Sequence, residues 1–362
     1  MRIVLAPDSF KGTATATEAA RALADGWRSV RPGDDLLSLP MADGGEGTLD
    51  AVATARPGAC VHEVPGCTGP DGRPVPGRYA LLPDGTALVE FATTGGLPLL
   101  GERLAPLTAT SRGTGETIAA ALDAGASALT VGLGGSASTD GGAGLLSALG
   151  LRLLDRSGTP LPDGGGALAA AARADLGSLR PAPPGGVRLL TDVTNPLLGP
   201  AGAAAVYGPQ KGAGAAEVAR LERGLERYAE LLGGDPRQPG AGAAGGTAYG
   251  LAAAWNARIT PGAAAVADLL GLDAALDGAD LVVTGEGRFD ATSLLGKAVG
   301  EVLARARRAA VPVRVVAGDS TDARALTLLS LAGDPEDARR RAAHWLHRAG
   351  ALLARSAGPA AG

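Results

Sequence analysis

The sequence is poor in the residues that would indicate a disulfide framework, a metal-binding finger or a nucleic-acid surface. It has only two cysteines, Cys60 and Cys67, and with only His62 nearby they fall short of a metal-ligand pattern. Its formal net charge is −4, and no block of Lys and Arg forms a basic stripe that could follow a phosphate backbone. We therefore expect structural cysteines and no nucleic-acid partner.

Long hydrophobic runs are also missing. The N-terminus, MRIVLAPDSF, holds an apolar run of only about four residues before a polar break, which is too short for a signal peptide. No later stretch approaches the roughly 20 uncharged apolar residues that a membrane-spanning helix needs. The sequence therefore predicts a cytoplasmic protein with no membrane partner.

Histidine and lysine are scarce. The three histidines lie in a predicted hairpin region (His62) and on the last predicted helix (His344 and His347), so a histidine base or metal site is not expected. Only three of the 33 basic residues are lysines, and each lies next to a glycine: Lys11, Lys211 and Lys297. A lysine kept among so many arginines indicates a place that requires a compact point charge, although chance survival is the alternative.

Length and composition indicate a globular protein of two domains. A chain of 362 residues exceeds what one hydrophobic core usually organises, and 46% of the residues are apolar despite 57 glycines. Short apolar runs alternate with stretches of helical periodicity, which is typical of a mostly parallel sheet with helices on its faces. The predicted strands are Arg2–Ala6, Asp35–Leu39, Ala128–Gly132, Val187–Thr191, Asp280–Thr284 and Val313–Ala317. The predicted helices are Ala14–Ser29, Gly113–Ala124, Ala215–Leu232, Lys297–Ala309 and Pro335–Leu353.

The middle of the chain differs from its ends. From about Cys60 to Pro106 it is rich in Pro and Gly, which predicts short strands and turns with the character of an antiparallel hairpin. Clear strand-helix units return from Asp280 onward. The simplest division is one α/β domain formed by residues 1–59 and 276–362, with a second α/β domain, residues 60–275, inserted between them.

Candidate site residues lie in the loops that follow the predicted strands, because ligands of open α/β sheets bind beyond the carboxyl ends of the strands. The first strand is followed by Asp8, Ser9 and Lys11, directly before a helix. These residues place a carboxylate, a hydroxyl and an ammonium group together. A solvated helix cap is the alternative interpretation.

The second predicted strand runs into the loop MADGGEGT. In this loop Asp43 and Glu46 flank the glycine pair Gly44 and Gly45, which lets a ligand approach the backbone. A simple turn needs only one glycine. We therefore interpret the loop as an anion- or metal-linked site.

The glycine-rich segment that follows Ala128–Gly132 allows two interpretations. The pattern Gly132-x-Gly134-x-x-Ala137, with Asp155 at the tip of the next predicted strand, matches a dinucleotide fingerprint and would indicate an NAD-dependent hydroxyacid dehydrogenase. The loop, however, stays glycine-rich where that fingerprint requires a helix to begin. We favour a phosphate cradle of backbone amides. Its candidate residues are Gly134, Gly135, Ser136 and Asp140.

A further acidic loop follows Val187–Thr191. Asp192 and Asn195 lie just past the strand end, where they are placed to orient a hydroxyl nucleophile and to hold a metal ion. An Asx-type turn leading into Pro196 is the alternative. Gln210 and Lys211 come later in the same segment, next to a glycine.

The loop after Asp280–Thr284 brings Glu286, Asp290 and Lys297 to the start of a helix. Across all these loops the available groups are carboxylates, lysine ammonium groups and backbone amides. Phosphoryl transfer needs these groups, which hold magnesium, accept a hydroxyl proton and neutralise phosphate charge. A Walker A motif and a protein-kinase signature are both absent, so the nucleotide site must be of another design.

A set of ordered motifs resembles the bacterial glycerate kinase family. The motifs are APDSFKG, MADGGEGT, GLGGSASTDGGAG, DVTNPLLGPAGAAAVYGPQKGA, GAGAAGG, DLVVTGEGRFD, LLGKAVGEV and LTLLSLAGDPEDARRRAAHWL, and together they cover Met1 to Leu353. The resemblance implies a flavodoxin-like parallel-sheet domain formed by both chain ends, with an inserted second α/β domain. It also implies an ATP- and Mg²⁺-dependent kinase that phosphorylates glycerate, usually on its 2-hydroxyl.

The catalytic roles that follow from this resemblance are hypotheses. Asp43 or Asp192 would orient and deprotonate the glycerate hydroxyl. A lysine would balance charge on the γ-phosphoryl group or on the substrate carboxylate. The candidates for that role are Lys11, Lys211 and Lys297.

Ligand and metal contacts are assigned in the same way. The ATP phosphates would lie near Gly134–Ser136 and Gly44–Gly45. Magnesium would be held by acids drawn from Asp192, Glu286 and Asp290. The other residues predicted to bind substrate or nucleotide are Asp8, Ser9, Glu46, Asp140, Asn195 and Gln210.

The chain departs from the family pattern at three places, one of which is the late loop Ala317-Gly318-Asp319-Ser320-Thr321, where relatives have a more glycine-rich form. It has Asp290-Ala291-Thr292-Ser293 where relatives typically have a glutamine in Asp-x-Gln-Thr, and it lacks the proline that often follows Lys297. Every charged group is kept, so we expect the reaction class to be unchanged. The alternatives are a 3-phosphoglycerate product, the dehydrogenase, or a non-catalytic metabolite-binding protein. Either a monomer or a homodimer is expected.

Overall fold

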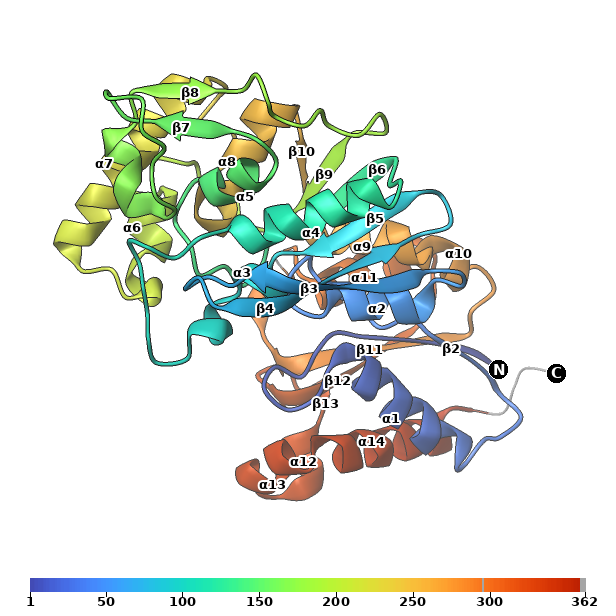
Figure 1. Cartoon of the computed structure of the whole chain (residues 1–362). Helices are drawn as coiled ribbons and strands as arrows, with labels where there is room; N and C mark the ends of the chain where they lie inside the picture. The colour runs from blue at the N-terminus through green and yellow to red at the C-terminus, as the bar shows by residue number, and fades with distance from the viewer. Residues whose placement is uncertain (295, 359–362) are drawn as a thin grey trace. The chain divides into compact units, whose positions relative to one another are not determined.

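The chain divides into two compact units (Figure 1). The computed structural model describes residues 1–294 and 296–358, so Leu295 of the LLGKAVGEV motif lies outside the described residues. The first unit comprises Met1–Asp43, Asp50–Pro57 and the chain from Pro261 onward, and the second comprises Gly44–Leu49 and Gly58–Thr260. In the described part of the chain, no helix is both long and apolar enough to cross a membrane.

Five parallel strands form the sheet of the first unit, in the order β13-β12-β11-β1-β2. Their bounds are β1 Arg2–Pro7, β2 Asp35–Ser38, β11 Leu281–Phe289, β12 Val313–Ser320 and β13 Leu326–Thr327. Numbered within the unit alone, this order is 2-1-3-4-5, which is the flavodoxin-like order. β1 and β11 come from opposite ends of the chain and pair directly, with Ile3 opposite Leu281. The predicted flavodoxin-like domain formed by both chain ends is confirmed.

Two helices from opposite ends of the chain pack closely in the first unit. They are α1 (Ala16–Arg28), which begins at a capping box between Thr15 and Glu18, and α14 (Ala342–Ser356). Figure 1 shows them side by side. A Cβ atom added at Gly26 would collide with the carbonyl of His347, so the two backbones approach at a glycine. The other helices of this unit are α9 Gly262–Leu270, α10 Leu272–Leu276, α11 Ala298–Arg308, α12 Leu328–Ala332 and α13 Pro335–Arg340.

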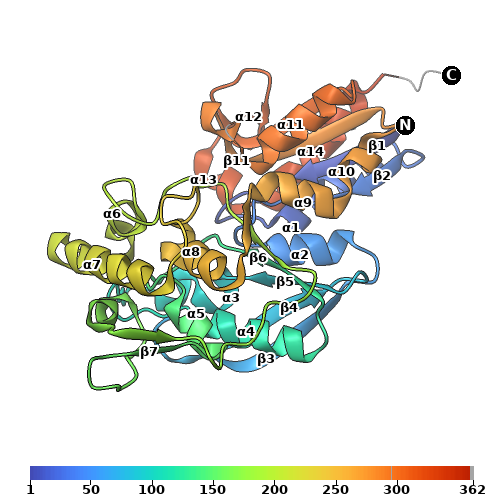
Figure 2. The ribbon, with the colours of Figure 1, turned by 90° about the horizontal axis from the view of Figure 1, so that it is seen from above.

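A mixed sheet forms the core of the second unit, in the order β10-β9-β6-β5-β4-β3. Its strands are β3 Cys60–Thr68, β4 Pro74–Leu81, β5 Thr86–Glu90, β6 Ala128–Gly132, β9 Val187–Leu190 and β10 Arg258–Thr260. β3, β4 and β5 are antiparallel neighbours and can be followed in Figure 2, whereas β5, β6, β9 and β10 run parallel. The predicted hairpin and the predicted inserted α/β fold are both confirmed.

Helices complete the second unit. They are α3 Ala92–Gly95, α4 Arg112–Asp123, α5 Ala143–Ala148, α6 Ala203–Tyr207, α7 Ala215–Leu232 and α8 Ala243–Trp255. Short 3₁₀ helices lie at Leu97–Leu100, Gly165–Ala170 and Pro209–Lys211, and a fourth, Ala291–Leu294, belongs to the first unit. Helix α2, Thr48–Ala55, contains the point at which the chain passes from the second unit back to the first.

The dinucleotide-binding interpretation of the Gly132 pattern is wrong. β7 (Arg152–Leu154), the strand before Asp155, pairs antiparallel with β8 (Arg173–Asp175) in a separate two-stranded sheet. A dinucleotide-binding unit requires that strand to continue the parallel sheet beside β6. Helix α5 begins only at Ala143, so no helix starts at the glycine pattern itself. Asp155 instead accepts hydrogen bonds from the amides of Ser157 and Thr159 in its own turn.

The division into units differs from the sequence-based boundaries mainly after Thr260. Residues 261–275 group with the first unit, whereas the sequence predicts that the inserted domain ends at residue 275. Arg305 of α11 explains this, because its guanidinium donates to the carbonyl of Ala264 (3.0 Å) and pairs with Asp268 (2.7 Å) and Asp273 (3.0 Å). This buried arginine ties α9 and α10 to α11.

The last predicted helix, Pro335–Leu353, is two helices. They separate at Arg341, whose backbone is not helical (φ −116°, ψ 33°). Asp337 of α13 accepts a hydrogen bond from Nε1 of Trp345 (2.9 Å), which links the two helices across the break. Periodicity alone could not show the break, because both helices keep the same apolar spacing.

We expect the Gly26→Ala variant to lower the stability of the protein by about 2 kcal/mol. The collision is with a backbone carbonyl, which cannot rotate away, so its cost exceeds the modest gain in helix propensity. Thermal unfolding followed by circular dichroism measures the change. Gly33→Ala is the matched control, because an added Cβ there meets open space. An unchanged melting temperature for Gly26→Ala would contradict the packing of α1 on α14.

Candidate active site

Three carboxylates gather at the carboxyl ends of neighbouring strands in the first unit. Asp8 directly follows β1, and its amide donates to the carbonyl of Gly285 on β11 (2.8 Å). Glu286 is the next residue of β11, and Asp43 follows β2. In a 2-1-3-4-5 sheet the crevice between the first and third strands is the switch point where ligands bind. The fold therefore places Asp8 and Glu286 at that position.

The pKa values of Asp8 and Glu286 in this cluster are both raised, first by burial and then by neighbouring acids. Burial raises the pKa of Asp8 to about 7, the negative charges of Asp43 and Glu286 add to that rise, and the hydrogen bond from the Ser9 amide (2.6 Å) opposes it. Burial also raises the pKa of Glu286, against the opposing effects of Ser293 and Lys297. Among the described residues, the buried Oε1 of Glu286 has no hydrogen-bond partner. A bound cation would favour the ionised forms of Asp8 and Glu286, which burial and neighbouring negative charge disfavour.

Two predicted residues of the first unit lie near Glu286. The charges of Lys297 and Asp290 both act on its pKa, Lys297 lowering it and Asp290 raising it. Asp290 accepts hydrogen bonds from the amide and hydroxyl of Thr292 (2.9 and 2.6 Å), which lower its own pKa. Lys297 and Lys11 are both exposed at the surface. The structure therefore brings Glu286, Asp290 and Lys297 into electrostatic contact, as the sequence suggested.

In the second unit, the glycines of two predicted loops pack against each other. A Cβ atom added at Gly132 would lie 2.6 Å from the carbonyl oxygen of Gly44, and one at Gly134 would collide with the Cα atom of Gly45. At Gly44, whose φ is +87°, it would lie 2.7 Å from the Cβ of Leu190. These glycines thus allow a close approach of backbone to backbone. Glu46, from the same loop, is exposed.

Glu90 is a positioning residue that the sequence analysis missed. It lies at the carboxyl end of β5, is only 5% exposed, and accepts hydrogen bonds from the amides of Gly47 and Leu49 (both 3.0 Å). Its carboxylate thereby anchors the Gly44–Leu49 loop at the start of α2. A lone acid at a strand end carries no motif, so its position at the end of Thr86–Glu90 was the only available signal.

The loop after β6 has the features of an anion cradle. It is held by hydrogen bonds from Leu97 to the carbonyl of Gly135 and from Ala137 to the carbonyl of Gly95 (both 2.8 Å). Gly135 is exposed and has φ +75°, a conformation that favours glycine. In the described part of the chain, the amides of Gly135 and Ser136 donate no hydrogen bond. Two adjacent amides that donate to no acceptor in the described residues are the kind of donors that bind a phosphate oxygen.

Lys211 does not lie at the surface of this loop. It is only 1% exposed, and its Nζ donates to the hydroxyl of Ser136 (2.9 Å) and to the carbonyl of Ser138 (2.5 Å). Burial lowers its pKa to about 7, and the negative charge of Asp140 opposes that change. The sequence analysis named Lys211 as one of three lysines that could balance charge on the γ-phosphoryl group or on the substrate carboxylate. The structure instead buries its ammonium group against the glycine loop.

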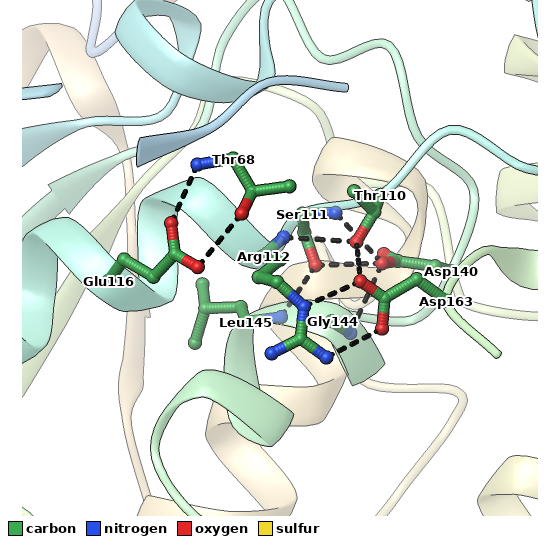
Figure 3. Close-up of polar contacts among 9 residues, drawn as sticks. All are labelled: Thr68, Thr110, Ser111, Arg112, Glu116, Asp140, Gly144, Leu145 and Asp163. Carbon is green, nitrogen blue, oxygen red and sulfur yellow. Dashed lines mark hydrogen bonds and ion pairs between the residues drawn. The ribbon is translucent and has the colours of Figure 1, made fainter. Parts of the chain in front are cut away.

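Asp140 is fully buried and saturated by hydrogen bonds (Figure 3). Its Oδ2 accepts from the amide and hydroxyl of Ser111 (2.9 and 2.8 Å) and from the amide of Gly144 (3.2 Å), and its Oδ1 accepts from the amide of Gly142 (3.0 Å). The Ser111 hydroxyl in turn accepts from the amide of Leu145 (2.9 Å). Asp140 was predicted to bind ligand, but these contacts direct its oxygens to the first turns of α4 and α5.

An ion pair on α4 lies close to this network. Figure 3 shows the guanidinium of Arg112 paired with Asp163 through Nε and Nη2 (2.6 and 2.8 Å). Asp163 also accepts from the hydroxyl of Thr110 (3.2 Å), and that hydroxyl accepts from the amide of Arg112 (3.1 Å). This bidentate pair fixes the N-terminal turn of α4 beside Asp140.

Three predicted residues of the second unit remain to be placed, and they are Asp192, Asn195 and Gln210. Asp192 lies just past the end of β9, as expected, and is partly exposed. Asn195 instead stabilises its own loop, because its amide donates to the carbonyl of Ala201 (2.8 Å) and accepts from the Tyr207 hydroxyl (2.6 Å). Gln210 is exposed.

The predicted metal ligands come from both units, Asp192 from the second and Glu286 and Asp290 from the first. Among residues 1–294 and 296–358, no three His, Cys, Asp or Glu side chains are placed to hold a metal ion by themselves. Magnesium usually binds one or two carboxylates and completes its shell with water and substrate phosphates. The oxygen donors of the Asp8, Asp43 and Glu286 cluster, with the unsatisfied Oε1 of Glu286, fit this kind of site.

The fold defines a class of protein: a two-unit α/β protein that has an acidic cluster near the carboxyl ends of the strands of its first unit and a glycine-rich loop after β6 in its second. Residues 3–357 match the profile described as the Glycerate kinase family. The chain belongs to the glycerate kinase family.

Curated relatives and a solved structure cover nearly the whole chain. It is 42% identical to a protein named glycerate kinase from Bacillus subtilis (strain 168), over 98% of this chain and 97% of that one. It is also 42% identical to one named glycerate 2-kinase from Escherichia coli (strain K12), over 89% and 86%. A crystal structure from Salmonella typhimurium LT2, which carries the provisional name glycerate kinase 2, superposes with a TM-score of 0.83 at 39% identity and covers 98% of this chain and 99% of its own.

The raised pKa of Asp8 predicts a pH-dependent stability. Between its ordinary value of 3.8 and about 7, the folded chain binds a proton that the unfolded chain releases, so stability falls as pH rises through this range. We expect Asp8→Asn to be more stable than the wild type at pH 8 by on the order of 1–3 kcal/mol, and equally stable near pH 4. Urea unfolding in EDTA at several pH values measures the difference.

The control for this prediction is Asp25→Asn, which makes the same change at an exposed carboxylate on α1. Its effect should be small and should not grow between pH 4 and pH 8. If the difference in unfolding free energy between Asp8→Asn and the wild type is also the same at pH 4 and pH 8, the acidic cluster does not hold Asp8 protonated.

Proposed function

We propose that this chain is an ATP-dependent glycerate kinase, which transfers the γ-phosphoryl group of ATP to a hydroxyl of D-glycerate. The 2-hydroxyl is the acceptor we favour, so the products are 2-phosphoglycerate and ADP. Family membership over residues 3–357 supports the reaction, and the name of the Escherichia coli relative supports the 2-position. The observation that carries the proposal is the pairing of an acidic strand-end cluster with a separate amide cradle in one chain of this family.

In the proposed reaction, the glycerate hydroxyl oxygen attacks the γ-phosphorus and the bond from that phosphorus to the bridging oxygen of ADP breaks. The hydroxyl proton passes to a carboxylate. Asp43 and Asp192 are the proposed acceptors. Asp43 belongs to the acidic cluster whose charge raises the pKa of Asp8.

Several donors of this chain would bind the phosphates. The unpaired amides of Gly135 and Ser136 suit an anionic oxygen. Lys11 and Lys297 are exposed lysines at loops of the first unit and supply positive charge for the phosphoryl group or the substrate carboxylate. Lys211 does not share this role, because its ammonium group is buried.

A magnesium ion, when bound, would neutralise charge on the phosphate oxygens. We propose that Glu286 is one of its ligands, since its buried Oε1 has no other partner among the described residues. Asp290 and Asp192 remain the other proposed ligands. The carboxylate oxygens of all three match the preference of magnesium for oxygen.

Phosphorus NMR of a mixture of protein, ATP, magnesium chloride and D-glycerate tests the proposal. We expect ADP and 2-phosphoglycerate to appear together. A 3-phosphoglycerate signal would keep the kinase and move the acceptor to the other hydroxyl. If ATP stays intact and neither phosphoglycerate forms, the proposed function is wrong.

The Glu286→Gln variant tests the proposed metal contact. Loss of one anionic ligand should lower kcat at least 100-fold at low magnesium and raise the magnesium concentration needed for half-maximal rate about tenfold. Coupled ADP assays across a magnesium series measure both quantities. Glu226→Gln, on the exposed face of α7, is the control and should match the wild type. An unchanged magnesium dependence in Glu286→Gln would remove Glu286 from the metal site.

A further inference from the structure

Lys211 lies under the glycine loop of the second unit and contacts it twice. It belongs to the 3₁₀ helix Pro209–Lys211, which is closed by Gly212 with φ 92°. Its Nζ reaches the Ser136 hydroxyl at 2.9 Å and the Ser138 carbonyl at 2.5 Å, while 1% of the residue is exposed. A ligand at the loop surface would therefore contact Ser136 and not Lys211.

The contact with Ser136 fixes the direction in which that hydroxyl can donate. A lysine ammonium group has donors and no acceptor, so the Ser136 oxygen must accept from it. The single hydroxyl hydrogen of Ser136 is then free to point elsewhere. In the described part of the chain it donates to no acceptor. Ser136 is partly exposed, so this hydrogen is available to a ligand.

The donors at this loop form one set. The hydroxyl of Ser136 joins the unpaired amides of Gly135 and Ser136 on two consecutive residues. Three donors without an opposing acceptor select an anionic oxygen and reject a neutral donor group. Whether the Ser136 hydroxyl donates its hydrogen to a ligand or to Lys211 depends on the charge state of the buried lysine.

We propose that Lys211 is a positioning residue, which holds the Ser136 hydroxyl as a donor to a phosphate oxygen of the bound nucleotide without contacting the nucleotide. The identity of the ligand rests on the proposed function. The role suits a lysine, because a compact ammonium group and a planar guanidinium are not interchangeable at a buried contact. The negative charge of Asp140 favours the ammonium form.

A double-mutant cycle on Lys211 and Ser136 tests the proposal. Lys211→Met keeps the length of the side chain and removes its donors, and Ser136→Ala removes the hydroxyl. We expect each single variant to weaken binding of Mg-ATP about tenfold by calorimetry, with kcat changed less than about threefold. Because Lys211 acts through Ser136, adding Lys211→Met to Ser136→Ala should weaken binding by less than about twofold.

Two outcomes of the cycle would overturn the proposal. One is an equal tenfold loss from Lys211→Met with or without the Ser136 hydroxyl, which would mean that the lysine acts on the nucleotide directly. The other is unchanged binding in Ser136→Ala. Arg223→Met, an exposed residue of α7 outside the loop, is the control for loss of a basic side chain and should bind Mg-ATP as the wild type does.

A second measurement decides the question if Lys211→Met fails to fold. Since burial lowers the pKa of Lys211 to about 7, the affinity advantage of wild type over Ser136→Ala should be largest at pH 6 and smaller at pH 8.5. A neutral amine can accept from Ser136, so the donor direction is no longer fixed. The quantity compared is the ratio of the Mg-ATP affinity of wild type to that of Ser136→Ala at each pH. Titration of ATP itself affects both proteins equally and cancels in this ratio. Asp140 is the charged group that acts on Lys211, and Tyr228, whose pKa is raised well above 10, stays neutral. A ratio that does not change with pH contradicts the proposal.

The two proposals fail in different ways. If wild-type protein does not bind ATP, the proposed function is wrong, and the same variants are then compared with inorganic phosphate as the probe. If wild-type protein binds and phosphorylates normally but the cycle is additive, only the role of Lys211 is wrong.

Discussion

The buried carboxylate of Asp140 is the contact on which the second unit depends most. An ionised carboxyl group without water costs several kcal/mol unless donors replace its hydration. Here three backbone amides and the Ser111 hydroxyl do so, and these donors come from the first turns of α4 and α5. The positive ends of both helix dipoles add to this stabilisation. The carboxylate thereby occupies two helix N-termini that would otherwise need a partner.

This buried charge also organises the loop that we assign to phosphate binding. The negative charge of Asp140 favours the ammonium form of Lys211, which is itself almost fully buried. Lys211 in turn holds Ser136 and Ser138, on either side of Ala137. The amides of Gly135 and Ser136 and the Ser136 hydroxyl are then the loop's available donors among the described residues, whereas the charges of Lys211 and Asp140 are buried. A polar network of this kind is stable only when its members are satisfied together.

The sequence predicted the architecture well. The spacing of apolar runs located β1, β2, β6, β9, β11 and β12, because buried parallel strands are continuous apolar runs. It missed the short strands β10 and β13 and the parallel role of β5, and β11 continues to Phe289, beyond its predicted end at Thr284. It also placed Asp8 at a strand end, whereas Glu286, predicted in the loop after its strand, lies within β11. The strand order then made β1 and β11 neighbours. Which loops carry the acids was thus predictable. How their pKa values respond to one another needed the fold.

Side-chain direction could not be predicted, and most of the corrections arise from it. Asp140, Asn195 and Lys211 all lie in the predicted loops, yet their polar atoms bind the protein itself. The glycines near Gly44 and Gly134 do permit a close approach, as expected, but the partner that the structure shows is another backbone. A glycine in a loop sequence indicates that another group approaches the backbone closely. It does not show whether that group is a ligand or another part of the chain.

The central claim is that this chain moves a phosphoryl group from ATP to glycerate. Transfer of label from γ-³²P ATP tests it most directly, with the products separated by ion-exchange chromatography. The account predicts that label enters a phosphoglycerate in a one-to-one ratio with the ADP formed. Label that appears only as inorganic phosphate, at a rate independent of glycerate, would contradict it.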